Sequence, residues 1–99
     1  MSISFTTSIV SRLKRDIEQM EKQLVDERKK KDKAQAKVKQ LEKDSKKSHL
    51  PSDFSNKLSR INKLKTESEE SIKKQALLTK QLVQKKAELQ QHLSKEKHD

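Results

Sequence analysis

The sequence contains no cysteine, glycine, tryptophan or tyrosine, and its 99 residues include only one proline and two phenylalanines. The absence of cysteine excludes disulfides, a thiol nucleophile and a thiolate metal site. Glycine is the usual residue for positive φ, so a fold of strands and tight turns is not expected. The chain also lacks a secretory signal pattern and any apolar run of membrane-spanning length, and we therefore expect a cytoplasmic protein that does not enter a membrane.

Charged residues make up 40% of the chain and hydrophobic residues only 28%, which is too few for a conventional globular core. The chain is rich in Lys, Gln, Glu, Leu and Ala, which all favour helix. Such a composition is typical either of disorder or of long helices in a coiled coil. The spacing of the apolar residues decides between the two.

A seven-residue repeat of apolar residues runs from Ile3 to Leu41. Alternating steps of three and four residues, as in Val10, Leu13 and Ile17, place these side chains on one narrow stripe of a helix. A stripe of this width is sealed by another helix. The repeat therefore predicts a helix over about residues 5–46.

The repeat ends before Pro51, which disfavours helical geometry at Leu50 and lacks the N–H that a continuing helix would need. Ser52 or Asp53 is a candidate N-cap for a second helix. The expected organisation is one domain over residues 1–99, with a hinge at about 47–52 and a second helix over about 53–96.

The second arm has a less strict pattern, in which Ile61, Ile72 and Val83 are spaced by eleven residues. An eleven-residue spacing predicts a broad apolar face and weak supercoiling. In a hairpin, the numbers of paired residues add to a constant, and pairing Leu13 with Val83 and Leu24 with Ile72 gives 96 in both cases. The fold class expected is an all-α, antiparallel two-helix coiled-coil hairpin. Its helix–helix interface is predicted to contain Val10, Leu13, Ile17, Met20, Leu24, Ala34, Val38, Leu41, Phe54, Leu58, Ile61, Ile72, Ala76, Leu82, Val83, Leu89 and Leu93.

Polar residues interrupt both arms, and this pairing places Glu27 and Lys31 opposite Ser68 and Lys65. A polar layer reduces stability but can fix the register of two helices. Because one hairpin buries so few apolar side chains, we expect it to dimerise, most simply into a four-helix bundle, or to form a higher homo-oligomer.

The excess positive charge is confined to residues 28–65, which hold fourteen Lys or Arg and four acidic residues, whereas the rest of the chain has eleven of each sign. This distribution fits either a solvated surface, which we favour, or contact with phosphates or an acidic protein surface. Nucleic-acid binding would be non-specific, because no aromatic stacking platform or groove-reading motif is present. The candidate anion-binding residues are Arg28, Lys29, Lys30, Lys33, Lys37, Lys46, Lys47, Lys57 and Arg60.

Catalytic and cofactor-binding patterns are missing from the sequence. His92 and His98, six residues apart near one terminus, do not stack on one helical face, and with His49 they are the only histidines. The serines and threonines have no positioned base, and there is no glycine-rich phosphate loop. We expect no enzymatic activity, no metal and no cofactor.

Several segments resemble the N-terminal coiled-coil region of bacterial effectors that carry a C-terminal toll/interleukin-1 receptor (TIR) domain. These segments are SIVSRLKRDI at 8–17, LVDERKK at 24–30, KVKQL at 37–41, KLSRI at 57–61, IKKQALL at 72–78 and KKAEL at 85–89. The resemblance implies that the coiled coil assembles the protein, whereas the TIR domain of that family cleaves NAD with a glutamate. No residue of that catalytic domain is carried over to this chain.

Three hypotheses follow for the function. The first is an oligomerisation scaffold, the assembly domain of a defence or signalling effector. The second is a basic helical arm that binds nucleic acid. The third is a small chaperone or helical-hairpin substrate of a specialised secretion system, which the absence of tryptophan from the hinge makes the least favoured.

Overall fold

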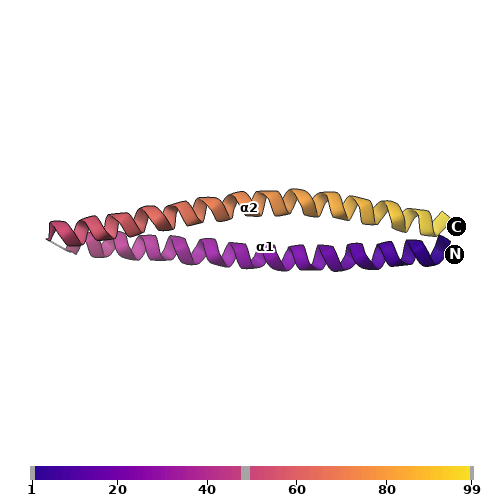
Figure 1. Ribbon diagram of the computed structural model, residues 1–99, viewed down its shortest axis with the longest axis horizontal. Helices are drawn as coiled ribbons and strands as arrows, with labels where there is room; N and C mark the ends of the chain where they lie inside the picture. The colour runs from indigo at the N-terminus through magenta and orange to yellow at the C-terminus, as the bar shows by residue number, and fades with distance from the viewer. Residues whose placement is uncertain (1, 48–49, 99) are drawn as a thin grey trace. The chain divides into compact units, whose positions relative to one another are not determined.

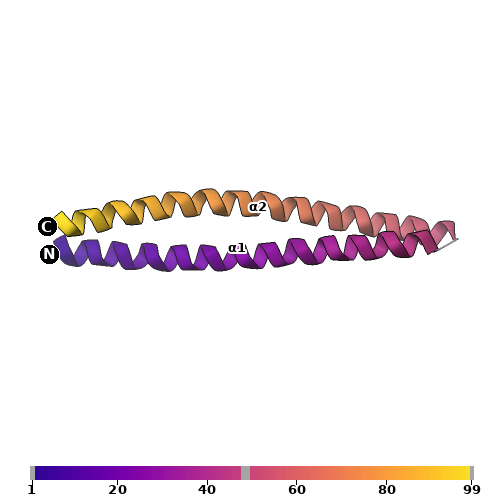
Figure 2. The same cartoon turned by 180° about the vertical axis from the view of Figure 1, so that it is seen from behind.

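The computed structural model describes the backbone of residues 2–47 and 50–98 and the side chains of residues 7–47 and 50–95. It contains two helices, α1 (Ser2–Lys47) and α2 (Pro51–His98), and no strand within the described residues. The two helices run antiparallel and pack against each other, as the views from the front and from behind both show (Figures 1 and 2). The helical hairpin predicted from the sequence is confirmed.

Helix α2 begins earlier than predicted. The carbonyl oxygen of Leu50 accepts a hydrogen bond from the backbone N–H of Phe54 at 3.0 Å, so Leu50 occupies the N-cap position and Pro51 the first helical position. Proline suits that position because its φ is already helical and its missing N–H would have no partner there. Neither Ser52 nor Asp53 is the N-cap, and Asp53 instead lies in the first turn, where the helix dipole favours an acidic residue. Ser48 and His49, at the centre of the expected hinge, lie outside the described residues.

The chain divides into two compact units, and each contains one segment of α1 and one of α2. Unit 1 comprises Met1–Val25 and Ala76–Asp99, and unit 2 comprises Asp26–Gln75. In unit 1, the buried cluster is Ile17, Leu24 and Leu82, with Met20, Leu78 and Leu89 packed against it. In unit 2, the buried cluster is Val38, Leu41 and Ile61, with Leu64 packed against it.

The buried residues of α1 follow the seven-residue repeat. In the two units together, the apolar side chains of α1 that are buried are Val10, Leu13, Ile17, Leu24, Ala34, Val38 and Leu41. Met20 is half-buried, and the polar residues Glu27 and Lys31 continue the same stripe. A strict heptad spacing keeps this one stripe facing the partner helix.

The buried face of α2 is not the one predicted from the eleven-residue spacing. Its buried and half-buried positions follow alternate steps of three and four residues and include Ile61, Leu64, Ser68, Ser71, Gln75, Leu78, Leu82, Lys85 and Leu89. Against a heptad seam of 3.5 residues per turn, a step of eleven rotates a side chain away by about 50°. The exposed fraction accordingly rises from 5% at Ile61 to 48% at Ile72 and 64% at Val83.

Five predicted interface residues are therefore corrected. Phe54, Leu58, Ile72, Ala76 and Val83 are exposed in the hairpin of one chain, so the prediction that they pack between its two arms is wrong. Leu93 is half-buried, like Leu89. The predicted interface matched large apolar side chains with one another and did not allow for Ser71 and Gln75 in the seam.

The register of the two helices also differs from the predicted one. The residue numbers of Asp16 and Lys85, which form an ion pair in unit 1, add to 101. Those of Asp44 and Lys57, which are hydrogen bonded in unit 2, add to the same value. The predicted sum of 95–96 is wrong by about five residues, which is more than a helical turn of α2.

Candidate functional site

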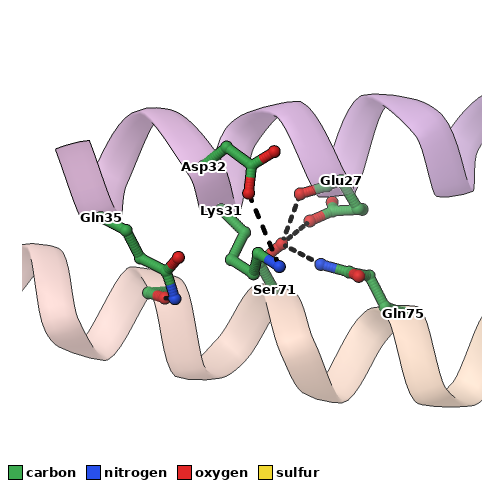
Figure 3. A network of polar contacts seen from close by, with 7 residues as sticks. Glu27, Lys31, Asp32, Gln35, Ser71 and Gln75 are labelled. Atoms are coloured by element: carbon green, nitrogen blue, oxygen red, sulfur yellow. Dashed lines mark hydrogen bonds and ion pairs between the residues drawn. The ribbon is translucent and has the colours of Figure 1, made fainter.

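A layer of polar side chains occupies the seam of unit 2, and we call it the polar layer. Its members are Glu27, Lys31 and Gln35 of α1 and Ser68, Ser71 and Gln75 of α2. Figure 3 shows the side chains of Glu27, Lys31, Gln35, Ser71 and Gln75 between the two facing helices. Ser71 is only 2% exposed, less than any of the buried apolar side chains.

The hydroxyl of Ser71 is the centre of the polar layer. It lies 2.8 Å from the carboxylate Oε2 of Glu27 and 2.8 Å from the carbonyl oxygen of the same residue, and it can donate to either. Gln75 Nε2 donates to the Ser71 hydroxyl at 3.4 Å (Figure 3). A side-chain oxygen so close to the backbone of the opposite helix requires a close approach of the helices, which a small residue permits.

The charged members of the polar layer are paired, but not as predicted. Lys31 Nζ lies 3.6 Å from Asp32 Oδ1 on its own helix, and Lys74 Nζ lies 3.9 Å from Glu27 Oε1. Lys65, predicted to oppose Lys31, instead pairs with Glu42 at 3.7 Å. The predicted contact between two lysines is therefore wrong, since each has a carboxylate partner.

Ser68 was correctly expected at a polar level, but it accepts a hydrogen bond from Gln35 Nε2 at 3.3 Å rather than facing Glu27. Within the described side chains, every buried polar atom has a hydrogen-bond partner. A fully satisfied network can specify a unique alignment, whereas a half-satisfied one would destabilise the fold. The polar layer therefore acts as a structural element that fixes register.

A second surface is an apolar stripe on the outside of α2 in unit 2. Phe54, Leu58 and Ile72 are each about half exposed, and their spacing places them within about 40° of one another around the helix. We call these three residues the apolar stripe. Beside it runs an open, shallow groove to which Val38, Lys65 and Ile72 contribute.

Unit 1 also carries exposed large apolar side chains, namely Val25, Leu77 and Val83. Val25 lies on α1 and the other two on α2. Leu77 and Val83 are six residues apart, a spacing that points them in directions about 120° apart. Val83, eleven residues after Ile72, points within about 20° of the direction of the apolar stripe, whereas Leu77 points away from it and Val25 lies on the other helix. Isolated apolar residues such as Val25 and Leu77 are ordinary on protein surfaces.

The structure exposes eight of the nine candidate anion-binding residues. They are Arg28, Lys29, Lys30, Lys33, Lys37, Lys46, Lys47 and Arg60. The ninth, Lys57, is half-buried, and its Nζ donates to the carbonyl oxygen of Asp44 at 3.4 Å. Lys57 therefore links the two helices, and it is removed from the set.

Six exposed lysines form two series on α1, spaced four residues apart within each series. The first consists of Lys29, Lys33 and Lys37, and the second consists of Lys39, Lys43 and Lys47; together we call them the lysine ridge. Like charges at this spacing destabilise a helix by about 0.2–0.5 kcal/mol per pair. Among the described ion pairs, none involves a lysine of the ridge.

Lys39 and Lys43 were missed by the sequence analysis. The signal that would have found them is their four-residue spacing with Lys47, because residues four apart are neighbours on a helix surface. With the missed residues, the exposed lysines extend from Lys29 to Lys47 over a basic face of α1 that is about 160° wide.

The described part of the chain contains no cluster of three or more His, Asp or Glu side chains that could hold a metal ion. Of the predicted histidines, His92 is half-buried, whereas the side chains of His49 and His98 lie outside the described residues. Neither described helix combines enough length with enough apolar character to cross a lipid bilayer.

Neither the scan of family models nor the searches of curated proteins and solved structures found a match to this chain.

Proposed function

We propose that this chain is a non-catalytic assembly module, which associates with a second copy of itself through the apolar stripe of α2. The observation that carries the proposal is the alignment of Phe54, Leu58 and Ile72, each about half exposed, on one side of one helix. Aligned apolar side chains outside the seam of a coiled coil are typical of contact with a further helix.

The positions of the apolar residues favour a second copy as the occupant. Leu58 and Ile72 are equally far along α2 from Lys65. Two antiparallel α2 helices related by a two-fold axis at Lys65 would bring Leu58 of one copy level with Ile72 of the other. Lys65 of one copy would then face Lys65 of the other at the axis, and the Glu42 carboxylate that pairs with each lysine would offset their repulsion.

The narrow seam supports the same proposal. Each helix of the hairpin buries one stripe, and in unit 2 part of that stripe is the polar layer. Burial of the apolar stripe between two copies would add apolar contact that one chain alone does not make. Two hairpins paired in this way form a four-helix arrangement.

The test is to replace the three residues of the apolar stripe together by glutamine (Phe54→Gln, Leu58→Gln and Ile72→Gln). Half-exposed side chains gain on the order of 1 kcal/mol each on complete burial, and a symmetric dimer contains six of them. We expect the dimer dissociation constant to rise at least about a hundredfold. Sedimentation equilibrium over a concentration series would measure it, with the unaltered chain approaching twice its mass of 11.6 kDa.

A control replaces the exposed apolar residues of unit 1 that do not share the face of the apolar stripe (Val25→Gln and Leu77→Gln), which are exposed to a similar extent. This variant should keep the affinity of the unaltered chain. A monomeric unaltered chain at all concentrations, or an equal loss in the control, would contradict the proposal. Circular dichroism of all three proteins verifies that the helices are retained.

The sequence resemblance leads to a narrower proposal, that the module assembles an effector of the TIR class in the bacterial cytoplasm. A TIR domain encoded downstream of residue 99 in the natural reading frame would support it. A different effector domain at that place would contradict it, without affecting the test of self-association.

A further inference from the structure

We infer that the lysine ridge of α1 binds the phosphate backbone of nucleic acid without sequence preference. The ridge consists of Lys29, Lys33, Lys37, Lys39, Lys43 and Lys47, all of them exposed. This inference does not depend on self-association, because of the six lysines only Lys39 lines the groove beside the apolar stripe.

The lysines of the ridge have no carboxylate partner among the described ion pairs. Between residues 28 and 65, fourteen cations face four carboxylates, and of these cations the described ion pairs involve only Lys31 and Lys65. The acidic residue that lies between Lys29 and Lys33 in the sequence is Asp32, and it is paired with Lys31. The positive charges of neighbouring ridge lysines therefore repel one another in the free protein, and a bound polyanion would reduce that repulsion.

Solubility alone does not account for the charge of the ridge. Unit 1 holds nine Lys or Arg and six acidic residues, a net charge of +3, and some of these form the ion pairs Asp16–Lys85 and Glu21–Lys86. Unit 2 holds sixteen Lys or Arg and nine acidic residues, a net charge of +7. Charges of both signs are thus sufficient to solvate helices of this chain. A one-signed array is not required for solubility, so its concentration in unit 2 points to an anionic partner.

The axial spacing of the ridge lysines suits a polyanion with regularly spaced charges. Within each series the lysines recur about every 6 Å along the helix axis. Each strand of a nucleic-acid duplex presents a phosphate about every 3.4 Å of its own axis, so successive flexible lysines each have a phosphate within reach. The six lysines spread over about 160° of the helix surface, so a polyanion that lies along α1 can reach them with several successive phosphates.

The same surface is poorly suited to a lipid bilayer. A helix that lies on a membrane presents large apolar side chains beside its cations. In unit 2, the exposed large apolar residues are Leu50 and the three residues of the apolar stripe, and none of them belongs to α1. Nucleic acid is therefore the partner that the arrangement favours.

The test is fluorescence anisotropy with a labelled 20-base-pair DNA duplex of mixed sequence, together with the corresponding single strand. If all six lysines contact phosphates, the logarithm of the binding constant should fall with the logarithm of salt concentration with a slope of about −5 on the duplex. Affinity should then fall about a thousandfold between 50 and 200 mM salt. A second duplex of unrelated sequence should bind equally well.

Replacing the six ridge lysines by glutamine should weaken duplex binding at 50 mM salt at least about a hundredfold and flatten the salt dependence. The matched control removes six exposed cations from unit 1 and leaves the same net charge: Arg12→Gln, Lys14→Gln, Arg15→Gln, Lys22→Gln, Lys80→Gln and Lys95→Gln. This control should lose less than about tenfold. Lys→Arg changes at all six ridge positions should retain binding, because the charges remain.

Three results would overturn the inference. One is the absence of binding to either nucleic acid at 50 mM salt, and another is an equal loss in the ridge variant and its control. The third is binding to anionic phosphatidylserine vesicles or to polyglutamate in preference to both nucleic acids. Helix content measured by circular dichroism should be equal in all variants, since lysine and glutamine have similar helix propensities.

Discussion

Replacement of Leu82 by alanine is expected to lower the free energy of unfolding by about 2–4 kcal/mol, whereas Val83→Ala should change it by less than about 0.5 kcal/mol. Leu82 is 6% exposed and packs in the cluster with Ile17 and Leu24. Val83 is adjacent in the sequence but 64% exposed. Alanine favours helix more than valine does, so the second variant could gain slightly in stability.

Urea unfolding followed by circular dichroism, at one fixed protein concentration, measures both differences. The two variants lose aliphatic groups at neighbouring positions of the same helix, so the comparison isolates burial. The reverse order of effects would mean that the eleven-residue pattern, rather than the heptad, faces α1. Equal effects would mean that the seam is not formed in solution.

Replacement of Ser71 by leucine is expected to destabilise the hairpin by about 2–5 kcal/mol, although leucine is the usual residue at such a position of a coiled coil. The hydroxyl of Ser71 lies 2.8 Å from the backbone carbonyl oxygen of Glu27, so the seam has no room for a larger side chain. The same substitution removes the donor to the Glu27 carboxylate, which is largely buried. Crowding and the loss of a hydrogen bond to a charged group act in the same direction.

Two further variants separate these causes. Ser71→Ala removes the hydroxyl without crowding and should cost about 1–2 kcal/mol. Ser59→Leu makes the same change at an exposed position of α2 and should be nearly neutral. Thermal unfolding of the three variants would contradict the structure if Ser71→Leu proved as stable as the unaltered chain or more stable.

Sequence periodicity was sufficient for α1 and insufficient for α2, for a physical reason. In α1 the stripe is made mostly of Val, Leu and Ile, so hydrophobicity and burial coincide. In α2 the seam passes through Ser68 and Ser71, while Ile72 and Val83 lie outside it. Close helix approach makes a small polar residue the better seam residue there, and hydrophobicity alone does not report that preference.

The start of α2 shows a similar limit. Proline was interpreted as a break, with the helix resuming after it, because proline interrupts a helix that is already under way. At the first position of a new helix, the same fixed φ and missing N–H are favourable. Phe54 donating to the Leu50 carbonyl places the start of α2 at Pro51.

The candidate surfaces were predictable in part. The confinement of positive charge to residues 28–65 follows from counting, and eight of the nine cations selected are exposed. The ninth, Lys57, was selected for its charge, whereas its position relative to the Asp44 carbonyl depends on the register of the hairpin. The residues of the apolar stripe were predicted to lie between the two helices, because large apolar side chains are typical both of a buried seam and of an exposed stripe.

The polar layer has a consequence for alternative alignments of the two helices. If α2 slid along α1 by one heptad, the apolar rows would still meet, because Leu64 or Leu78 would occupy the level of Ser71. The Glu27 carboxylate would then face a leucine and lose its donor, and a charge held in such surroundings is strongly unfavourable. Several alignments would therefore bury leucines about equally well, but in one of them the Glu27 carboxylate accepts a hydrogen bond from the opposite helix. An exchanged pair, with α1 from one molecule and α2 from another, would satisfy the same requirement.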